Sequence, residues 1–179
     1  MKSKIMAQGK RIYLRKPDQK DKAEFIDKAN SSRKFLYPWI DIQVNDVYFE
    51  RYLQKLKDRS EGFLICLNDN DAIVGVININ EIVRGIFQSG YMGYYLFEQY
   101  AGQGYMTDGM RLVIKYAFAK LKLHRLEANI QPKNKASIKL VKRLGFKKEG
   151  LSLRYLKIGG RWRDHERWAL LKENWAKQS

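Results

Sequence analysis

Ala101-Gly-Gln-Gly-Tyr-Met-Thr-Asp108 places two glycines, one residue apart, between a strand-like run and a segment with helical periodicity. Glycine costs backbone entropy on folding and adds nothing to a hydrophobic core, so this spacing indicates close approach of the backbone to a ligand. The N-terminus of a helix carries unpaired N–H groups and a partial positive charge, and both features bind phosphate. We therefore predict a pyrophosphate site over 102–107, with Thr107 as the cap of the helix.

Two familiar phosphate-binding loops do not fit this stretch. A P-loop needs Gly-Lys followed by Ser or Thr, and that triplet is absent here. A dinucleotide loop needs a third glycine where this chain has Thr107, and an acid near the end of the next strand, where it has Ile130-Gln131. A tight turn that serves only the fold is the remaining alternative.

The sequence on both sides of the loop predicts an α/β domain. Apolar side chains from Met110 to Leu121 follow helical spacing, whereas those from Leu126 to Ile130 alternate as in a strand. The same patterns predict strands over 11–15, 62–67, 72–79, 91–97, 125–130, 151–158 and 162–171. They also predict one helix that begins at 17 and three others over 45–59, 107–120 and 134–144. This order predicts one domain over 1–179, with a single mixed central sheet of about seven strands and helices on both faces.

The charge balance favours a partner of negative charge. Lys and Arg number 35 against 19 Asp and Glu, a formal net charge of +16. Such a balance suits a phosphate-rich cofactor, RNA or an assembly that contains RNA, and the alternative is a solvated surface that only aids solubility. The basic residues are scattered, and no zinc-finger or basic-zipper pattern is present.

The single cysteine, Cys66, excludes an internal disulfide and a multi-cysteine metal site, and we expect it in the core. No metal is expected. The first residues lack the apolar centre of a signal peptide, and the longest apolar run, Ala72 to Ile77, is too short to span a bilayer. We therefore expect a cytoplasmic protein that does not enter the membrane.

Residues after the glycine loop carry a family resemblance. Asn134-Lys-Ala-Ser137, followed by Leu144-Gly-Phe-Lys-Lys-Glu-Gly150, resembles a pattern of the GCN5-related N-acetyltransferases, the GNAT superfamily. Their pyrophosphate loop is written [Q/R]-x-x-G-x-[G/A], and the present loop resembles it at Gly104 while departing at Ala101 and Met106.

One branch of that superfamily is similar over nearly the whole chain, from Arg11 to Leu171. Val83-Arg-Gly-Ile-Phe87 and Tyr155-Leu-Lys-Ile-Gly-Gly-Arg-Trp-Arg-Asp-His165 resemble the enzymes that acetylate the N-terminal amine of ribosomal proteins, the alanine and serine N-acetyltransferases.

The resemblance implies a GNAT fold in which the fourth and fifth strands, 91–97 and 125–130, splay apart. It implies direct transfer of acetyl from acetyl-CoA to a primary amine in a ternary complex. It also implies that the backbone of the fourth strand binds the pantetheine arm and stabilises the oxyanion, and that the loop binds the pyrophosphate. The implied residues are Tyr95, Leu96 and Phe97 on the strand; Gly102, Gln103, Gly104, Tyr105, Met106 and Thr107 in the loop; and Asn134 as a polar contact or a plain helix cap.

The resemblance is less complete at the catalytic groups. Many relatives protonate the leaving thiolate with a tyrosine at the position of Val141, and Ser137 is the substitute by position. The acid common in the ribosomal branch is replaced by Arg154, which leaves Glu81 as the candidate base. Ser137 as a first-turn polar residue and Glu81 as a surface carboxylate are the structural alternatives. We expect Asp164-His165 to order the last hairpin.

Three functions stay open on the sequence. The first is acetylation of the N-terminal α-amine of a ribosomal protein, with the basic surface free to associate with the ribosome or RNA. The second is acetylation of a small amine, such as a polyamine, an aminoglycoside or an amino acid, and the two cationic classes should prefer an acidic pocket. The third is a non-catalytic RNA-binding or ribosome-associated module. A monomer and a homodimer are equally consistent with the sequence.

Overall fold

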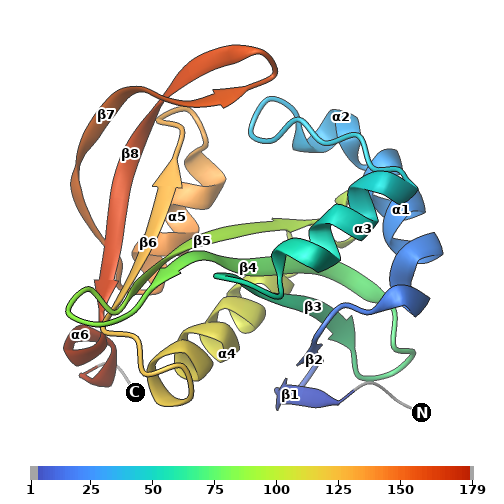
Figure 1. Ribbon diagram of the computed structural model, residues 1–179, viewed down its shortest axis with the longest axis horizontal. Coiled ribbons are helices and arrows are strands. Elements are labelled where there is room, and N and C mark those ends of the chain that lie inside the picture. Colours follow the sequence, from blue (N-terminus) through green and yellow to red (C-terminus); the bar gives the residue numbers. More distant parts are fainter. Residues whose placement is uncertain (1–3, 178–179) are drawn as a thin grey trace.

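The computed structural model describes residues 4–177, which form one mixed sheet with helices on both faces (Figure 1). Its strand order is β1-β2-β3-β4-β5-β6-β8-β7, and β5 and β6 run parallel to each other. The strands are β1 (Ile5–Gln8), β2 (Ile12–Arg15), β3 (Glu61–Leu67), β4 (Ile73–Val83), β5 (Ser89–Leu96), β6 (Arg125–Ile130), β7 (Lys147–Ile158) and β8 (Arg161–Leu171). The helices are η1 (Gln19–Asp21), α1 (Lys22–Ser31), α2 (Arg33–Leu36), α3 (Asp46–Lys55), η2 (Glu98–Tyr100), α4 (Tyr105–Ala119), α5 (Lys135–Arg143) and α6 (Lys172–Ala176).

The predicted α/β class is confirmed, and the predicted elements appear in their predicted order. The sheet has eight strands rather than about seven, because β1, which pairs with β2 at the edge of the sheet, was not predicted. The helix expected from residue 17 begins at Lys22, since Asp18 first caps the short turn η1 in a capping box with Asp21. Strand β4 runs past its predicted end at 79 to Val83.

The hydrophobic core lies in two layers, one on each face of the sheet. Side chains of β3 alternate between the layers: Phe63 and Ile65 pack toward α4, whereas Leu64 and Cys66 pack toward α1 and α3. The helical spacing predicted for α4 is confirmed, since its apolar side chains are buried against the sheet: Met110, Val113, Ile114, Ala117 and Phe118. Cys66 is fully buried, as expected.

Strands β5 and β6 pair over a short distance and then separate. Their parallel pairing joins Ser89–Tyr91 to Arg125–Glu127, and β5 continues to Leu96 with β4 as its remaining partner. Strand β6 continues to Ile130 alongside β8. The predicted splay of the fourth and fifth strands is therefore confirmed, and Figure 1 shows β5 and β6 diverging toward the end of the sheet that carries α5.

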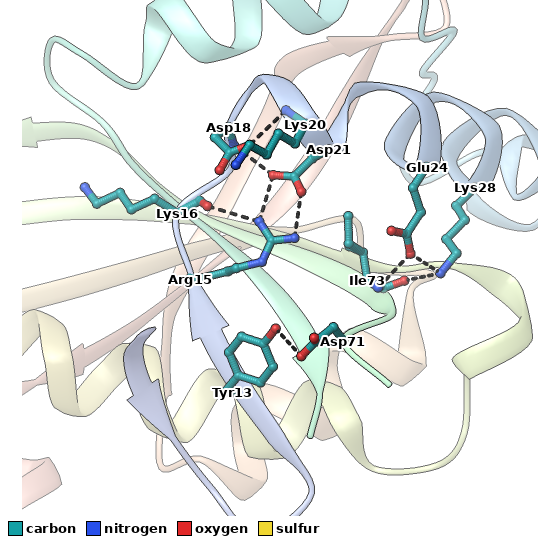
Figure 2. Close-up of polar contacts among 10 residues, drawn as sticks. All are labelled: Tyr13, Arg15, Lys16, Asp18, Lys20, Asp21, Glu24, Lys28, Asp71 and Ile73. Carbon is teal, nitrogen blue, oxygen red and sulfur yellow. Dashed lines mark hydrogen bonds and ion pairs between the residues drawn. The ribbon is translucent and has the colours of Figure 1, made fainter. Parts of the chain in front are cut away.

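A polar cluster attaches the first helices to the sheet (Figure 2). Arg15 on β2 donates from Nη1 and Nη2 to the two oxygens of Asp21, at 2.8 and 2.6 Å. Both side chains are about nine-tenths buried, with 11% and 7% of their surfaces exposed. Next to them, Glu24 and Lys28 of α1 bind the backbone N–H and C=O of Ile73, where β4 begins. These contacts fix α1 against the sheet.

Replacing Asp21 with alanine should destabilise the protein by about 3 kcal/mol, because it leaves a buried guanidinium without its carboxylate. The free energy of unfolding in urea measures the change. Lys16→Gln is the matched control, since the exposed Lys16–Glu61 pair should contribute less than about 1 kcal/mol. Equal losses in the two variants would show that the buried pair does not hold α1.

Candidate active site

The glycine loop leads directly into α4. Gly102 and Gly104 have φ angles of 75° and 85°, in the left-handed region that favours glycine. A Cβ on Gly102 would meet no atom within 4 Å, so that side of the loop faces open space. Gly104 is the N-cap of α4, and no side chain caps the first turn. Backbone N–H groups at this helix end are thus available to an anion.

Thr107 is not the cap that the sequence predicted. The left-handed turn at Gly104 starts α4 at Tyr105, two residues earlier than expected, so Thr107 lies inside the first turn. Its hydroxyl accepts a hydrogen bond from Nη1 of Arg143 at 3.5 Å, which brings a cation from α5 beside the loop.

Arg11 binds the glycine loop and the first turn of α4. Its Nε and Nη2 donate to Asp108 Oδ2 at 3.0 and 2.6 Å, and its Nη1 donates to the carbonyl oxygen of Gln103 at 2.9 Å. The guanidinium also lies 4.8 Å from the centre of the Tyr105 ring. Asp108 is an acid in the first turn of α4, close to the expected pyrophosphate, and Arg11 offsets its charge. Sequence reasoning missed this residue, because it lies 97 positions from Asp108.

Two cavities meet beside the splayed strands. One cavity, of about 340 Å³, is lined by the glycine loop together with Leu96, Leu140 and Arg143, and we call it the donor cavity because acetyl-CoA is expected on this side. The other, of about 570 Å³, is lined by residues of β4, β6 and the β7–β8 hairpin, among them Glu81, Gln131 and Tyr155. We call it the acceptor cavity because the amine is expected there. The two cavities share five lining residues: Trp39, Ile40, Tyr94, Asn134 and Ser137.

Most of the predicted cofactor residues line the donor cavity. They are Tyr95, Leu96, Gly102, Gly104, Met106, Thr107 and Asn134. Three others do not line it: Phe97 is buried in the layer below α1 and donates its N–H to Val74, Gln103 bonds through its side chain to Gln99, and Tyr105 packs against Tyr100.

The predicted Ser137 lies at the junction of the cavities. Its Oγ is 2.7 Å from the hydroxyl of Tyr94, and its N–H donates to Asn134 Oδ1 at 3.1 Å. Asn134 is therefore the N-cap of α5 and also part of the wall of both cavities. Burial raises the pKa of Tyr94 to about 12, so this phenol keeps its proton at neutral pH. Val141 is fully buried in the core and provides no donor.

Two bulges with left-handed residues shape the acceptor cavity. Glu81 has a φ angle of 48° at the point where the register of β4 shifts, and Glu81 lines the cavity. Arg154 also has φ 48°, in a bulge of β7, and Asp164 Oδ1 accepts its N–H at 2.7 Å. Within that bulge, Tyr155 lines the acceptor cavity and Arg154 does not. Asp164 therefore orders the hairpin.

His165 stands behind Tyr155, with 6.2 Å between the ring centres. It is buried, its Nδ1 lies 2.9 Å from the carbonyl oxygen of Arg163, and burial lowers its pKa. A neutral, hydrogen-bonded imidazole fits a packing role. Among residues 4–177, no group of three or more His, Cys, Asp or Glu is placed to hold a metal ion.

A family model described as an acetyltransferase (GNAT) domain matches residues 11–147. The chain belongs to the GNAT family of acetyltransferases. It is 35% identical over 175 residues to the probable N-acetyltransferase YjcK of Bacillus subtilis, covering 93% of this chain and 97% of that protein. It is 32% identical over 174 residues to the [ribosomal protein uS5]-alanine N-acetyltransferase of Escherichia coli, covering 92% and 90%.

The structure is also similar to that of Mycobacterium smegmatis RimJ in complex with CoA-disulfide. The TM-score is 0.83 at 27% identity, with 90% of this chain and 82% of that chain covered. The predicted resemblance to the ribosomal-protein branch is thus confirmed, as is the prediction of an acetyl-CoA-dependent N-acetyltransferase.

Arg11→Gln should weaken binding of CoA about five- to tenfold, because it frees the Gln103 carbonyl and leaves the charge of Asp108 unopposed beside the pyrophosphate. Isothermal titration with CoA measures the dissociation constant. Lys16→Gln removes a cation just beyond the other end of β2 and should leave the affinity unchanged. Unchanged affinity in Arg11→Gln would mean that the loop keeps its shape without this support.

Proposed function

We propose that this protein transfers acetyl from acetyl-CoA to the N-terminal α-amine of a ribosomal protein, by direct attack of the amine in a ternary complex. The observation that carries the proposal is the pair of cavities that share Tyr94, Asn134 and Ser137. A donor on one side and an amine on the other would meet there without a covalent enzyme intermediate.

The donor half is assigned to backbone groups. The N–H groups of 102–107 would hold the pyrophosphate, and Arg143 adds a nearby positive charge. The edge of β5 has no strand partner on the β6 side beyond Tyr91, so the backbone of Tyr95 and Leu96 is the candidate for the pantetheine arm and the oxyanion. The N–H of Phe97 is already donated to Val74.

Two side chains are assigned to proton chemistry. Glu81, on the wall of the acceptor cavity, is the candidate base that takes a proton from the attacking amine. Ser137 is the candidate hydrogen-bond donor to the departing thiolate, since it lines both cavities. An N-terminal amine has a pKa of roughly 8, so a weak base suffices.

The charges of the acceptor cavity favour one amine over a polycation. Among the described residues that line it, Glu81 is the one carboxylate and Lys55 the one basic side chain, while His165 is held neutral. A polyamine carries several cationic groups and needs several acids to bind them. A peptide with one terminal amine and an extended backbone fits this lining better.

The net charge of +16 supports docking on an RNA-rich particle, which would bring a ribosomal protein within reach. That setting would place the reaction in the cytoplasm. Within the described part of the chain, no helix has the length and apolar character needed to cross a membrane.

The test is CoA release from acetyl-CoA with an equal-concentration panel of amines. The panel holds peptides that begin with Ala, Ser or Met, the same peptides with blocked N-termini, spermidine, an aminoglycoside and free amino acids. We expect turnover on the free peptides and none on the blocked ones. Turnover on spermidine or another small amine alone would overturn the proposed acceptor.

Glu81→Gln should lower kcat about a hundredfold on the best peptide, because the amide cannot accept the proton, with little change in affinity for CoA. Steady-state kinetics with acetyl-CoA measures the split between kcat and KM. Glu173→Gln, which removes an exposed carboxylate of α6 that pairs with His124, should retain full activity. An active Glu81→Gln variant would assign the base to water.

A further inference from the structure

Tyr94 lines both cavities, but the proton chemistry proposed for Glu81 and Ser137 gives its hydroxyl no role. It lies on β5, between the short pairing with β6 and the predicted backbone contacts that begin at Tyr95. Its hydroxyl is 2.7 Å from the Oγ of Ser137 on α5, a residue that also lines both cavities. Strand β5 and helix α5 therefore meet through one hydroxyl pair.

The geometry of this pair determines which proton remains free. A hydroxyl donates one hydrogen bond and accepts up to two. Within residues 4–177, each of these two hydroxyls has the other as its hydrogen-bond partner. If Tyr94 donates to Ser137 Oγ, the proton of Ser137 is left to point into the junction of the cavities.

We propose that Tyr94 is a positioning residue that donates to Ser137, so that the Ser137 hydroxyl points at the sulfur of the departing CoA. This inference rests on the proposed function for the identity of the reaction, but not for the identity of the amine. When the C–S bond breaks, its electron pair goes to sulfur, and the thiolate is stabilised by the Ser137 O–H. The proton that the thiolate finally takes is the one that the attacking amine releases to Glu81 and solvent.

The acidity of the phenol decides between orientation and full proton transfer. Burial raises the pKa of Tyr94 to about 12, well above the value of about 8.5 for the reference thiol, that of cysteine. The phenol is therefore a weaker acid than the leaving thiol and does not hand over its proton. It stays a permanent donor to Ser137, and a chain of two hydrogen bonds strengthens the one that reaches the sulfur.

A purely structural role for Tyr94 is the competing explanation. Its ring is partly buried and packs against the layer below α4. Loss of the ring would disturb that layer, whereas Tyr94→Phe keeps the ring and removes only the hydroxyl. Tyr13→Phe is the matched control, since Tyr13 donates to Asp71 at 2.9 Å at a distant point of the sheet (Figure 2).

The first experiment is a double-mutant cycle on kcat with Tyr94→Phe, Ser137→Ala and the double variant. Each single variant should lose about tenfold in kcat while KM for acetyl-CoA stays within about twofold, because the bond to the thiolate is made as the C–S bond breaks. The double variant should lose no more than Ser137→Ala, since Tyr94 acts through Ser137. Losses that multiply would overturn the proposal.

The second experiment needs no acceptor amine. Ultraviolet absorbance of the thiolate gives the pKa of the CoA thiol bound to each variant. In the wild type this pKa should lie below that of free CoA, and Tyr94→Phe and Ser137→Ala should raise it by equal amounts, with Tyr13→Phe unchanged. An equal thiol pKa in the wild type and Tyr94→Phe would overturn the proposal. Turnover failure on every amine would count against the proposed function alone, since this titration still decides the role of Tyr94.

Discussion

The short pairing between β5 and β6 is the constraint on which the site depends. After Ser89–Tyr91 the two strands part, because β6 continues beside β8 while β5 keeps only β4. Backbone groups along the rest of β5 then lack a strand partner on one side, and an unmade backbone hydrogen bond is costly unless something else satisfies it. A ligand that runs along β5 as a strand would do so. The opening also admits the first turn of α5, which brings Ser137 to Tyr94.

Beside the donor cavity, the charge of one acid is balanced by one nearby cation. The helix end that would receive the pyrophosphate also carries Asp108, an unfavourable neighbour for a phosphate. Arg11 offsets that acid and at the same time donates a hydrogen bond to the Gln103 carbonyl. The large positive charge of the whole chain is thus a poor guide to this site, where one specific cation matters more than the sum.

Local sequence patterns predicted the helices and strands well. They could not predict contacts between residues that are far apart in the chain. The boundaries of β6 were predicted to the residue, and the apolar spacing of α4 and the glycine loop pointed to a phosphate site. The cap was predicted at Thr107 because threonine is a common N-cap residue, whereas the left-handed φ of Gly104 could not be read from composition. Arg11 and Tyr94 were missed, since each acts on a partner 43 or more positions away.

The lining of the acceptor cavity comes from other parts of the chain than the glycine loop, which is proposed to bind the pyrophosphate. Strand β8 before Glu166 has β7 as its partner, so the hairpin reaches beyond β6, and its turn lies near Tyr37: a Cβ on Gly159 would stand 3.4 Å from that ring. Such a layout is modular. Insertions or exchanges in the hairpin and in the segment after α2 can change the accepted amine while the donor half is inherited intact, which gives this architecture a short evolutionary path from one acceptor to another.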